Sequence, residues 1–380
     1  MSITGYIHKE YEPIADLSII GMNGVEDLLE KIDNYLIEWR QKEVKEKNLK
    51  TFKLNAKSIR FGNGEAKGVV YDTVRGHDVF IICDVYNYGV TYKLYGKDTP
   101  MSPDDHFQDL KRIIGAIGGK ARRITVIMPM LYQGRQDARQ MRESLDCAIA
   151  LQELERMGVE NIISFDVHEP KVQNAIPLSG FENVHPTYQM IKAFVNTEKD
   201  IKVDKEHLMI VSPDAGGTKR CIYYSAVMGV DLGMFYKRRD YTRVVNGKNP
   251  VVSHQFLGED VNGKDVILID DMIASGETLI DSAIKLREKG AKNIYMFAAF
   301  GLFNEGLARF DKAFEEGLIK RVYTTNLIYR TPELKAREWY KEVDMSKYIA
   351  SIIDVLNMDK SLSELLDPAQ KIKAILEKYS

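Results

Sequence analysis

Net charge, long apolar runs and cysteine are all scarce in this sequence. Lys and Arg number 53 against 55 Asp and Glu, which leaves a net charge of −2 over 380 residues. A protein that coats nucleic acid carries a basic excess, so we expect no nucleic-acid partner. The apolar runs, such as Val266–Ile269, fall far short of the ~20 residues that span a bilayer, so we expect no membrane partner.

The 3 cysteines, Cys83, Cys147 and Cys221, are scattered along the chain. They form no Cys-x-x-Cys pair and are odd in number, which excludes a disulfide framework or a structural zinc site. The N-terminus has no basic stretch followed by an apolar one, the pattern of a secretory signal. We therefore expect a cytoplasmic protein with reduced thiols. A hydrophobic fraction of 44% suffices for sizeable cores.

Apolar, β-branched runs alternate with amphipathic stretches. Five runs are predicted as buried strands: Asp78–Asp84, Ile124–Met128, Asn161–Phe165, Leu208–Val211 and Asp265–Ile269. Four stretches are predicted as helices: Gly24–Lys47, Gln140–Met157, Thr278–Lys289 and Ser361–Tyr379. This alternation predicts an α/β fold, with mainly parallel sheets flanked by helices.

The length predicts two domains, at roughly 100–200 residues per domain. The polar stretch Asn196–Glu206 is the predicted boundary. We therefore expect an N-terminal α/β domain over residues 1–195, a C-terminal α/β domain over 196–355, and a helical extension over 356–380. The stretch between Asp84 and Met101, rich in tyrosine and glycine, is predicted as an enlarged loop.

The strongest chemical signal is Val266–Leu279, which reads VILIDDMIASGETL. An apolar strand is followed by Asp270 and Asp271, and a loop of small residues then leads into a helix. Ligands of open α/β sheets bind outside the carboxyl ends of the strands, and a helix N-terminus attracts phosphate. The two acids supply acceptors for sugar hydroxyls. The motif therefore predicts a site for a phosphorylated sugar.

An ordinary acidic turn is the alternative interpretation, because Asp, Ser and Gly favour turns for reasons of backbone shape alone. The motif nevertheless resembles the phosphoribosyl-diphosphate loop of the type I phosphoribosyltransferase fold. The resemblance implies that this loop binds ribose 5-phosphate through Asp270, Asp271, Ala274, Ser275, Gly276, Glu277 and Thr278.

Further motifs stand in the order found in ribose-phosphate diphosphokinases. They are FGNGE at 61–65, Arg135-Gln136-Asp137, FDVHEP around His168, SPDAGGTKR at 212–220 and YKRRD at 236–240. The chain resembles this family from about Arg60 to about Ile353. The resemblance implies two domains of the type I phosphoribosyltransferase fold. It also implies transfer of the diphosphoryl group of ATP to the 1-hydroxyl of ribose 5-phosphate, which gives phosphoribosyl diphosphate and AMP.

The resemblance also implies a role for each motif. Lys237 and Arg239 would be the catalytic cations. The alternative interpretation of this pair is a solvated charged turn. The residues implied at ATP are Phe61, Asn63, Glu65, Arg135, Gln136, Asp137 and His168. His168 and Asp214 would hold Mg²⁺, the implied cofactor. The family forms homo-oligomers built from dimers, up to hexamers, in which Phe61, Asn63 and Glu65 reach the ATP of a neighbouring subunit.

Two positions depart from the family pattern. Ala274 stands where the family usually has a third acid, and Phe300 stands where a histidine is common. These departures keep alternatives open: a non-catalytic regulatory homologue, or a diphosphokinase that acts on another ribose 5-phosphate ester. A phosphoribosyltransferase that consumes phosphoribosyl diphosphate is disfavoured, because such chains lack the first half with its Arg-Gln-Asp motif.

Overall fold

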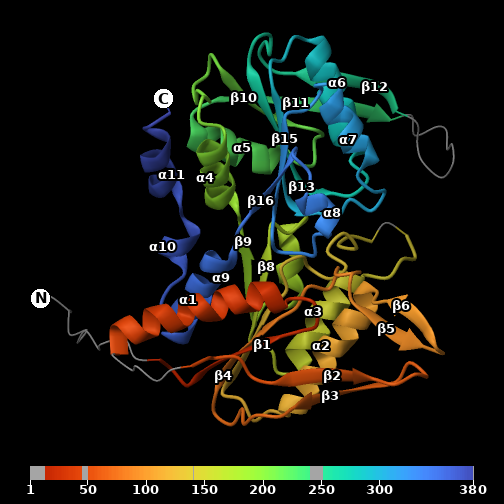
Figure 1. The fold of residues 1–380 in the computed structure, drawn as a ribbon, viewed down its shortest axis with the longest axis vertical. Helices are drawn as coiled ribbons and strands as arrows, with labels where there is room; N and C mark the ends of the chain where they lie inside the picture. The colour runs from red at the N-terminus through yellow and green to blue at the C-terminus, as the bar shows by residue number, and fades with distance from the viewer. Residues whose placement is uncertain (1–12, 45–49, 140, 240–250, 380) are drawn as a thin grey trace, which may run out of the picture. The chain divides into compact units, whose positions relative to one another are not determined.

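The computed structural model describes residues 13–44, 50–139, 141–239 and 251–379 (Figure 1). For residues 43–44, 237–239 and 251–254 it describes the backbone alone. The chain divides into two compact units: unit 1 comprises Met1–Val184 and Met345–Asp367, and unit 2 comprises His185–Asp344 and Pro368–Ser380. None of the helices in the described ranges is long and apolar enough to cross a membrane.

Unit 1 is built on a parallel sheet of order β1-β4-β7-β8-β9. Its strands are β1 (Leu17–Gly21), β4 (Asp78–Ile82), β7 (Arg123–Ile127), β8 (Asn161–Phe165) and β9 (Gly180–Val184). Its helices are α1 (Glu26–Val44), α2 (Pro103–Ile117), α3 (Asp146–Arg156), the 3₁₀ helix η1 (Pro170–Ala175), α9 (Ser346–Asn357) and α10 (Ser363–Leu366). Alternate residues Val79 and Ile81 of β4 share one core with α2 and α3, as expected when successive side chains point to opposite faces.

Two antiparallel hairpins stand outside this sheet. They are β2 (Ala56–Arg60) with β3 (Ala66–Val70), and β5 (Thr91–Leu94) with β6 (Lys97–Pro100). The second hairpin lies in the stretch that the sequence predicted as an enlarged loop, so the loop is partly structured. The first packs against α2, whose start is fixed by a capping box between Ser102 and Asp105.

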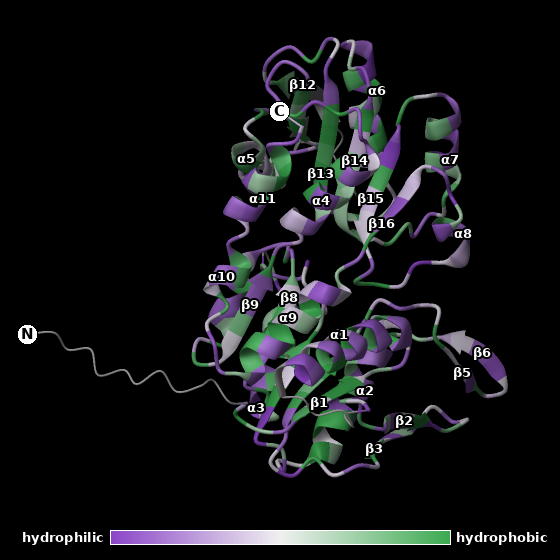
Figure 2. Cartoon of the chain, turned by 60° about the vertical axis from the view of Figure 1, so that its left-hand side comes forward, coloured by the Kyte–Doolittle hydropathy of each residue, from purple (hydrophilic) through white to green (hydrophobic). Residues whose placement is uncertain are grey.

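Unit 2 holds a sheet of order β12-β11-β10-β13-β14-β15-β16. Its strands are β10 (Leu208–Ser212), β11 (Asp231–Arg239), β12 (Val251–Leu257), β13 (Asp265–Ile273), β14 (Ile294–Gly301), β15 (Arg321–Thr325) and β16 (Tyr340–Val343). Its helices are α4 (Thr187–Thr197), α5 (Thr218–Met228), α6 (Glu277–Glu288), α7 (Ala308–Glu315), α8 (Pro332–Lys335) and α11 (Ala369–Leu376). Only the pairing of β12 with β11 is antiparallel among the described strands of this sheet. Figure 2 shows the hydrophobic colouring along β13, whose first five residues are buried.

The division of the chain differs from the ranges predicted from the sequence. The polar stretch Asn196–Glu206 connects α4 to β10 within unit 2, and the first segment of unit 1 ends at Val184. After Asp344 the chain returns to unit 1, because α9 packs against α1. There the Asn357 amide donates to Ala15 O at 3.1 Å and to Asp78 Oδ2 at 3.0 Å, and Arg40 donates to its oxygen at 3.1 Å.

The prediction of one helix over Ser361–Tyr379 is wrong, because two short helices, α10 and α11, occupy this stretch. The break falls at Asp367, with φ −104° and ψ 88°. Pro368 follows, and the residue before a proline is pushed out of the helical region by steric clash with the proline ring. The break also coincides with the change from unit 1 to unit 2.

Candidate active site

Two predicted motifs of unit 2 follow neighbouring strands and lie at the same end of its sheet. Strands β10 and β13 are parallel neighbours, so the segment that follows Ser212 and the segment around Asp270 lie at the same end of the sheet. The sequence predicted that the two acids follow the strand, but β13 continues through them to Ile273. The reason is that β14 stays paired beyond the acids, with Met272 opposite Phe300 and Ile273 opposite Gly301.

The sugar-phosphate loop turns sharply between β13 and α6. Gly276 is the N-cap of α6 and has φ +77°, a left-handed conformation that favours glycine. A Cβ at Gly276 would lie 2.3 Å from Cζ of Phe310, so the backbone also requires glycine for space. The Ser275 hydroxyl accepts from the Glu277 N–H at 3.3 Å. The N-cap residue Gly276 has no side chain to cap α6, and a helix N-terminus of this kind can bind phosphate.

Three carboxylates of unit 2 influence one another electrostatically. Asp271 is buried and Asp270 is half-buried. Burial, followed by the charges of Asp271 and Asp214, raises the pKa of Asp270 well above its usual range, while Arg220 opposes that rise. Such a cluster favours ligands that bring hydrogen-bond donors or positive charge. Arg220 is the last residue of SPDAGGTKR and was not predicted as a site residue.

The loop after β10 shapes the surroundings of Asp214. Its Oδ1 accepts from the Gly217 N–H at 3.1 Å, and its backbone carbonyl accepts from the Ser212 hydroxyl at 2.7 Å. A Cβ at Gly217 would lie 3.0 Å from the Ser212 Oγ. Glycine therefore allows the tight turn that presents the Asp214 carboxylate beside the start of α5.

In unit 1, two of the predicted ATP motifs follow neighbouring parallel strands. Arg135, Gln136 and Asp137 come after β7, and His168 comes after β8. The side chains of Arg135, Gln136 and His168 are exposed. Because β7 and β8 run parallel, these residues belong to the same end of the sheet.

Asp137 also influences a buried thiol. Burial, followed by the Asp137 charge, raises the pKa of Cys147 to about 12. Cys147 therefore stays protonated at neutral pH and is a poor nucleophile.

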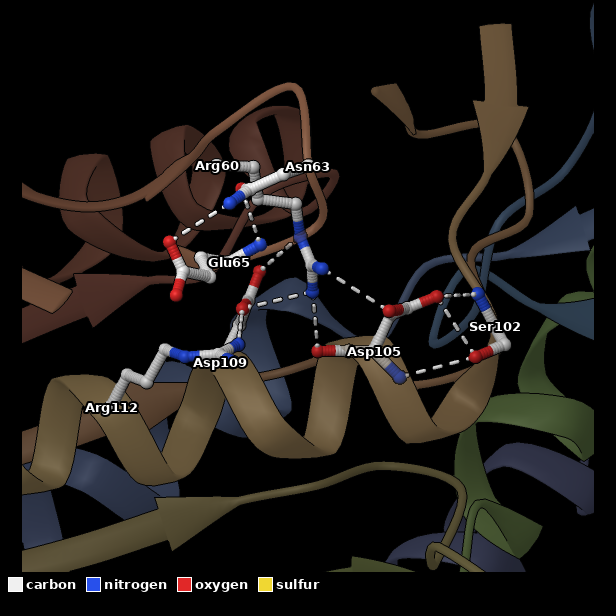
Figure 3. A network of polar contacts seen from close by, with 7 residues as sticks. All are labelled: Arg60, Asn63, Glu65, Ser102, Asp105, Asp109 and Arg112. Carbon is white, nitrogen blue, oxygen red and sulfur yellow. Dashed lines mark hydrogen bonds and ion pairs between the residues drawn. The ribbon is translucent and has the colours of Figure 1, made fainter. Parts of the chain in front are cut away.

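The predicted adenine motif is the tip of the β2–β3 hairpin. Phe61, Asn63 and Glu65 are all exposed there. The Asn63 amide donates to Glu65 Oε2 at 3.0 Å, and the Glu65 N–H donates to Asn63 Oδ1 at 3.1 Å. Figure 3 shows these contacts beside Arg60, the last residue of β2. The structure therefore places this motif on a hairpin, on elements other than those that carry Arg135 and His168.

Arg60 ties the base of that tip to α2. Its guanidinium donates to Asp105 Oδ1 at 3.1 Å and to Asp109 Oδ1 at 2.9 Å, and Arg112 also binds Asp109 (Figure 3). Asp109 is nearly fully buried, so the pair is shielded from screening by salt. Arg60 was not predicted as a site residue, although an arginine next to the FGNGE motif and the D-x-x-x-D spacing of Asp105 and Asp109 offered a signal.

The predicted catalytic pair lies at the end of β11. The backbone of Lys237 is paired with His254 of β12, and that of Arg239 with Val251. The side chains of Lys237 and Arg239 lie outside the described part of the structure. The predicted metal residues His168 and Asp214 belong to units 1 and 2 respectively. Across the described ranges, His, Cys, Asp and Glu side chains do not gather in threes in a way that could hold a metal ion.

Two α/β units with mainly parallel sheets, one of which carries a phosphoribosyl-type loop between β13 and α6, define a phosphoribosyltransferase-type architecture. The profile of the N-terminal domain of ribose phosphate pyrophosphokinase matches residues 17–158, and that of the phosphoribosyl synthetase-associated domain matches residues 243–367. The chain belongs to the ribose-phosphate pyrophosphokinase family. The fold class and the enzyme class predicted from the sequence are thereby confirmed.

Individual relatives agree with this family. The ribose-phosphate pyrophosphokinase of Mycoplasma pneumoniae is 32% identical over 275 residues, which cover 71% of this chain and 75% of the relative. That of Pasteurella multocida is 28% identical over 310 residues, 80% of this chain and 89% of the relative. The crystal structure of phosphoribosylpyrophosphate synthetase from Mycobacterium smegmatis has a TM-score of 0.72 at 22% identity, covering 90% of this chain and 99% of that chain. The structural match supports the same fold.

Proposed function

We propose that the chain transfers the diphosphoryl group of ATP to the 1-hydroxyl of ribose 5-phosphate, giving phosphoribosyl diphosphate and AMP. The observation that carries the proposal is the loop of unit 2, where Gly276 begins α6 shortly after Asp270 and Asp271. The helix N-terminus suits the 5-phosphate, and the carboxylates suit the ribose hydroxyls. Family membership supports the choice of ATP as donor.

The chemistry requires in-line attack at the β-phosphorus of ATP. The sugar 1-hydroxyl oxygen forms the new P–O bond, its proton is released, and the bond between the β-phosphorus and the AMP oxygen breaks. Catalysis of such transfers is mostly positioning and electrostatic stabilisation. Lys237 and Arg239 would supply cationic donors to the phosphate oxygens, and the planar fork of arginine suits phosphate well.

The residues present fit Mg²⁺ as the cofactor. Mg²⁺ keeps several waters and takes one or two protein carboxylates together with substrate phosphates. Asp214, held by the Gly217 N–H through one oxygen, can offer its other oxygen to such an ion. When bound, the ion would neutralise phosphate charge. His168 is the second residue proposed to hold it.

The ATP site is proposed from unit 1. Arg135, Gln136, Asp137 and His168 would contact the nucleotide at the end of β7 and β8. Phe61, Asn63 and Glu65 would reach the adenine bound by a neighbouring copy, which requires a homo-oligomer built from dimers. The three buried cysteines carry no disulfide, which is consistent with a cytoplasmic enzyme.

The test is a direct assay of the purified chain with ATP, Mg²⁺ and ribose 5-phosphate, in which AMP and phosphoribosyl diphosphate are quantified. Equal amounts of the two products support the proposal. Ala274 favours one competing function, transfer to another ribose 5-phosphate ester, because an acceptor that would face the sugar is replaced by a methyl group. A higher kcat/KM for such an ester would establish that function, and no turnover with any acceptor would indicate a regulatory homologue.

A further inference from the structure

The tips of the two hairpins of unit 1 are joined to each other. The backbone N–H of Tyr95, at the tip of β5–β6, donates to the carbonyl of Gly62, at the tip of β2–β3, with an N–O distance of 2.8 Å. Leu94 Cδ1 lies 3.2 Å from the position of a Cβ at Gly64. The hydrogen bond brings Tyr95 next to the FGNGE motif, although residues 66–94 separate them in the sequence.

A second contact joins the strands of the two hairpins. The Arg60 guanidinium lies over the ring of Tyr92 in β5, 4.6 Å from its centroid. The same guanidinium binds Asp105 and Asp109 of α2, as Figure 3 shows. Both hairpins are therefore fastened to α2 through one side chain, and their tips are held together as a unit.

The joined tips expose two aromatic rings. The exposed fraction is 45% for Phe61 and 79% for Tyr95. Single exposed aromatics are common on protein surfaces, but neighbouring aromatics on adjoining, anchored tips form a ready contact for a flat apolar ring.

Tyr95 stands at a backbone position that does not favour tyrosine. Tyr95 and Gly96 form the two-residue turn between Leu94 and Lys97, which are paired across the hairpin. Their φ angles are +47° and +79°. A two-residue turn with φ positive at both positions is type I′, for which Asn-Gly is strongly preferred. A bulky residue there costs conformational energy. This cost indicates that the tyrosine ring has a function that offsets it.

We propose that Tyr95 is a second adenine-binding residue, which stacks with the purine ring of the same ATP that Phe61 contacts. The inference rests on the proposed function, since it takes the FGNGE tip to reach ATP. Aromatic side chains stack on purines without requiring a particular base edge, so Tyr95 adds affinity for the donor nucleotide. The proposal gives Tyr95 no role in binding ribose 5-phosphate.

The residue preference of the turn provides a variant that removes the ring without disturbing the hairpin. Tyr95→Asn removes the ring and installs the residue that the turn prefers, so the hairpin keeps its shape and the thermal midpoint stays equal or rises. We expect the KM for ATP to rise about tenfold, because base stacking of this kind is lost. The KM for ribose 5-phosphate should not change. Tyr95→Phe retains the ring and should keep the native KM for ATP.

A matched control is Tyr71→Asn. Tyr71 is also exposed and follows β3, at the opposite end of the same hairpin from the tip, so its replacement should leave every kinetic constant unchanged. An unchanged KM for ATP in Tyr95→Asn overturns the proposal. A rise as large in Tyr95→Phe as in Tyr95→Asn overturns stacking as the cause.

Failure of the inference can be separated from failure of the proposed function. Calorimetric titration with MgATP measures nucleotide binding directly in the native chain and in Tyr95→Asn. If the native chain binds ATP and forms no phosphoribosyl diphosphate, the proposed reaction fails, and a weaker affinity in Tyr95→Asn still supports the inference. If the native chain binds no ATP, both are overturned.

Discussion

Phe310 closes the space behind Gly276. The ring of Phe310 is itself held by Phe303 at a centroid distance of 5.1 Å and by Trp339 at 5.5 Å, and Trp339 donates to Asp311 at 2.7 Å. A rigid aromatic cluster in the core of unit 2 thus fixes the turn that precedes α6. The position of the phosphate-binding backbone depends on residues that touch no substrate.

Gly276→Ala should therefore be costly for both stability and sugar binding. The left-handed φ costs an alanine about 1–2 kcal/mol, and overpacking against Phe310 adds about 1–3 kcal/mol. The expected result is a lower thermal midpoint and a higher KM for ribose 5-phosphate. Gly263→Ala is the control, because Gly263 has φ +76° and no atom within 4 Å of its Cβ position. It should show the smaller cost alone, with native kinetics.

Lys237→Ala should lower kcat far more than it weakens substrate binding, because the ammonium meets charge that develops in the transition state. Loss of one such donor costs about 2.7–4 kcal/mol. Steady-state kinetics at saturating ATP and ribose 5-phosphate measure the effect. Lys219→Ala, at an exposed lysine of α5, is the comparison. An unchanged kcat in Lys237→Ala would show that Lys237 has no role in catalysis.

The metal proposal predicts that Asp214→Asn raises the Mg²⁺ concentration needed for half-maximal activity. The substitution keeps a side-chain oxygen that can accept from the Gly217 N–H, so the loop should hold its shape while one negative charge is lost. Titration of Mg²⁺ at fixed ATP measures the shift. Full activity of the native chain in excess chelator would contradict the proposal.

Ala274→Asp tests the departure in the sugar-phosphate loop. The carbonyl of Ala274 accepts from the Asn304 N–H at 3.2 Å, and this backbone contact should survive the change. A hydrogen bond to a charged group contributes about 1.5–3 kcal/mol, so the new acceptor should change the KM for ribose 5-phosphate while kcat is kept or raised.

Asp271→Ala should have the opposite effect and nearly abolish sugar binding, because a buried acceptor is lost. Titrations of ribose 5-phosphate at saturating MgATP measure both variants. If Ala274→Asp destroys activity and the native chain prefers another ribose ester, the alanine is a specificity determinant.

The raised pKa of Asp270 predicts a pH-dependent stability effect. A carboxyl whose pKa is higher in the folded state destabilises the fold when ionised, and this penalty disappears as pH falls towards the unfolded value of about 3.9. Asp270→Asn should therefore raise the thermal midpoint at neutral pH, with a gain that shrinks towards pH 4. Asp281→Asn, at an exposed carboxylate of α6, should show no such gain. An equal gain at both pH values would show that charge is not the cause.

The sequence predicted the fold where local pattern decides it. Asn161–Phe165 is a strand with the predicted bounds, and α6 begins one residue before the predicted Thr278. Near-continuous apolar runs mark buried parallel strands, so β4, β7, β10 and β13 were accessible to inspection. β1 was missed, although its LSIIG is as long as the NIISF of β8, which was predicted.

Long-range contacts were not predictable in the same way. The hydrogen bond from Asn357 to Ala15 joins positions 342 residues apart. The local sequence of neither segment predicts this contact. The joined tips of the hairpins are similar, because Tyr95 contacts Gly62 through the backbone, which any residue could supply. For the site, motif order located the loop of unit 2, while the wall formed by Phe310 left no sequence signal because it is an ordinary core phenylalanine.

Because α9 belongs to unit 1, unit 1 cannot be completed until late in the synthesis of the chain. A ribosome releases the strands of unit 1 first, but the partner of Arg40 and Asp78, Asn357, is added only after the whole sheet of unit 2 has been made. During synthesis the nascent unit 1 must wait with one helix face of α1 uncovered. The segment Met345–Asp367 therefore joins unit 1 only after most of unit 2 has been synthesised.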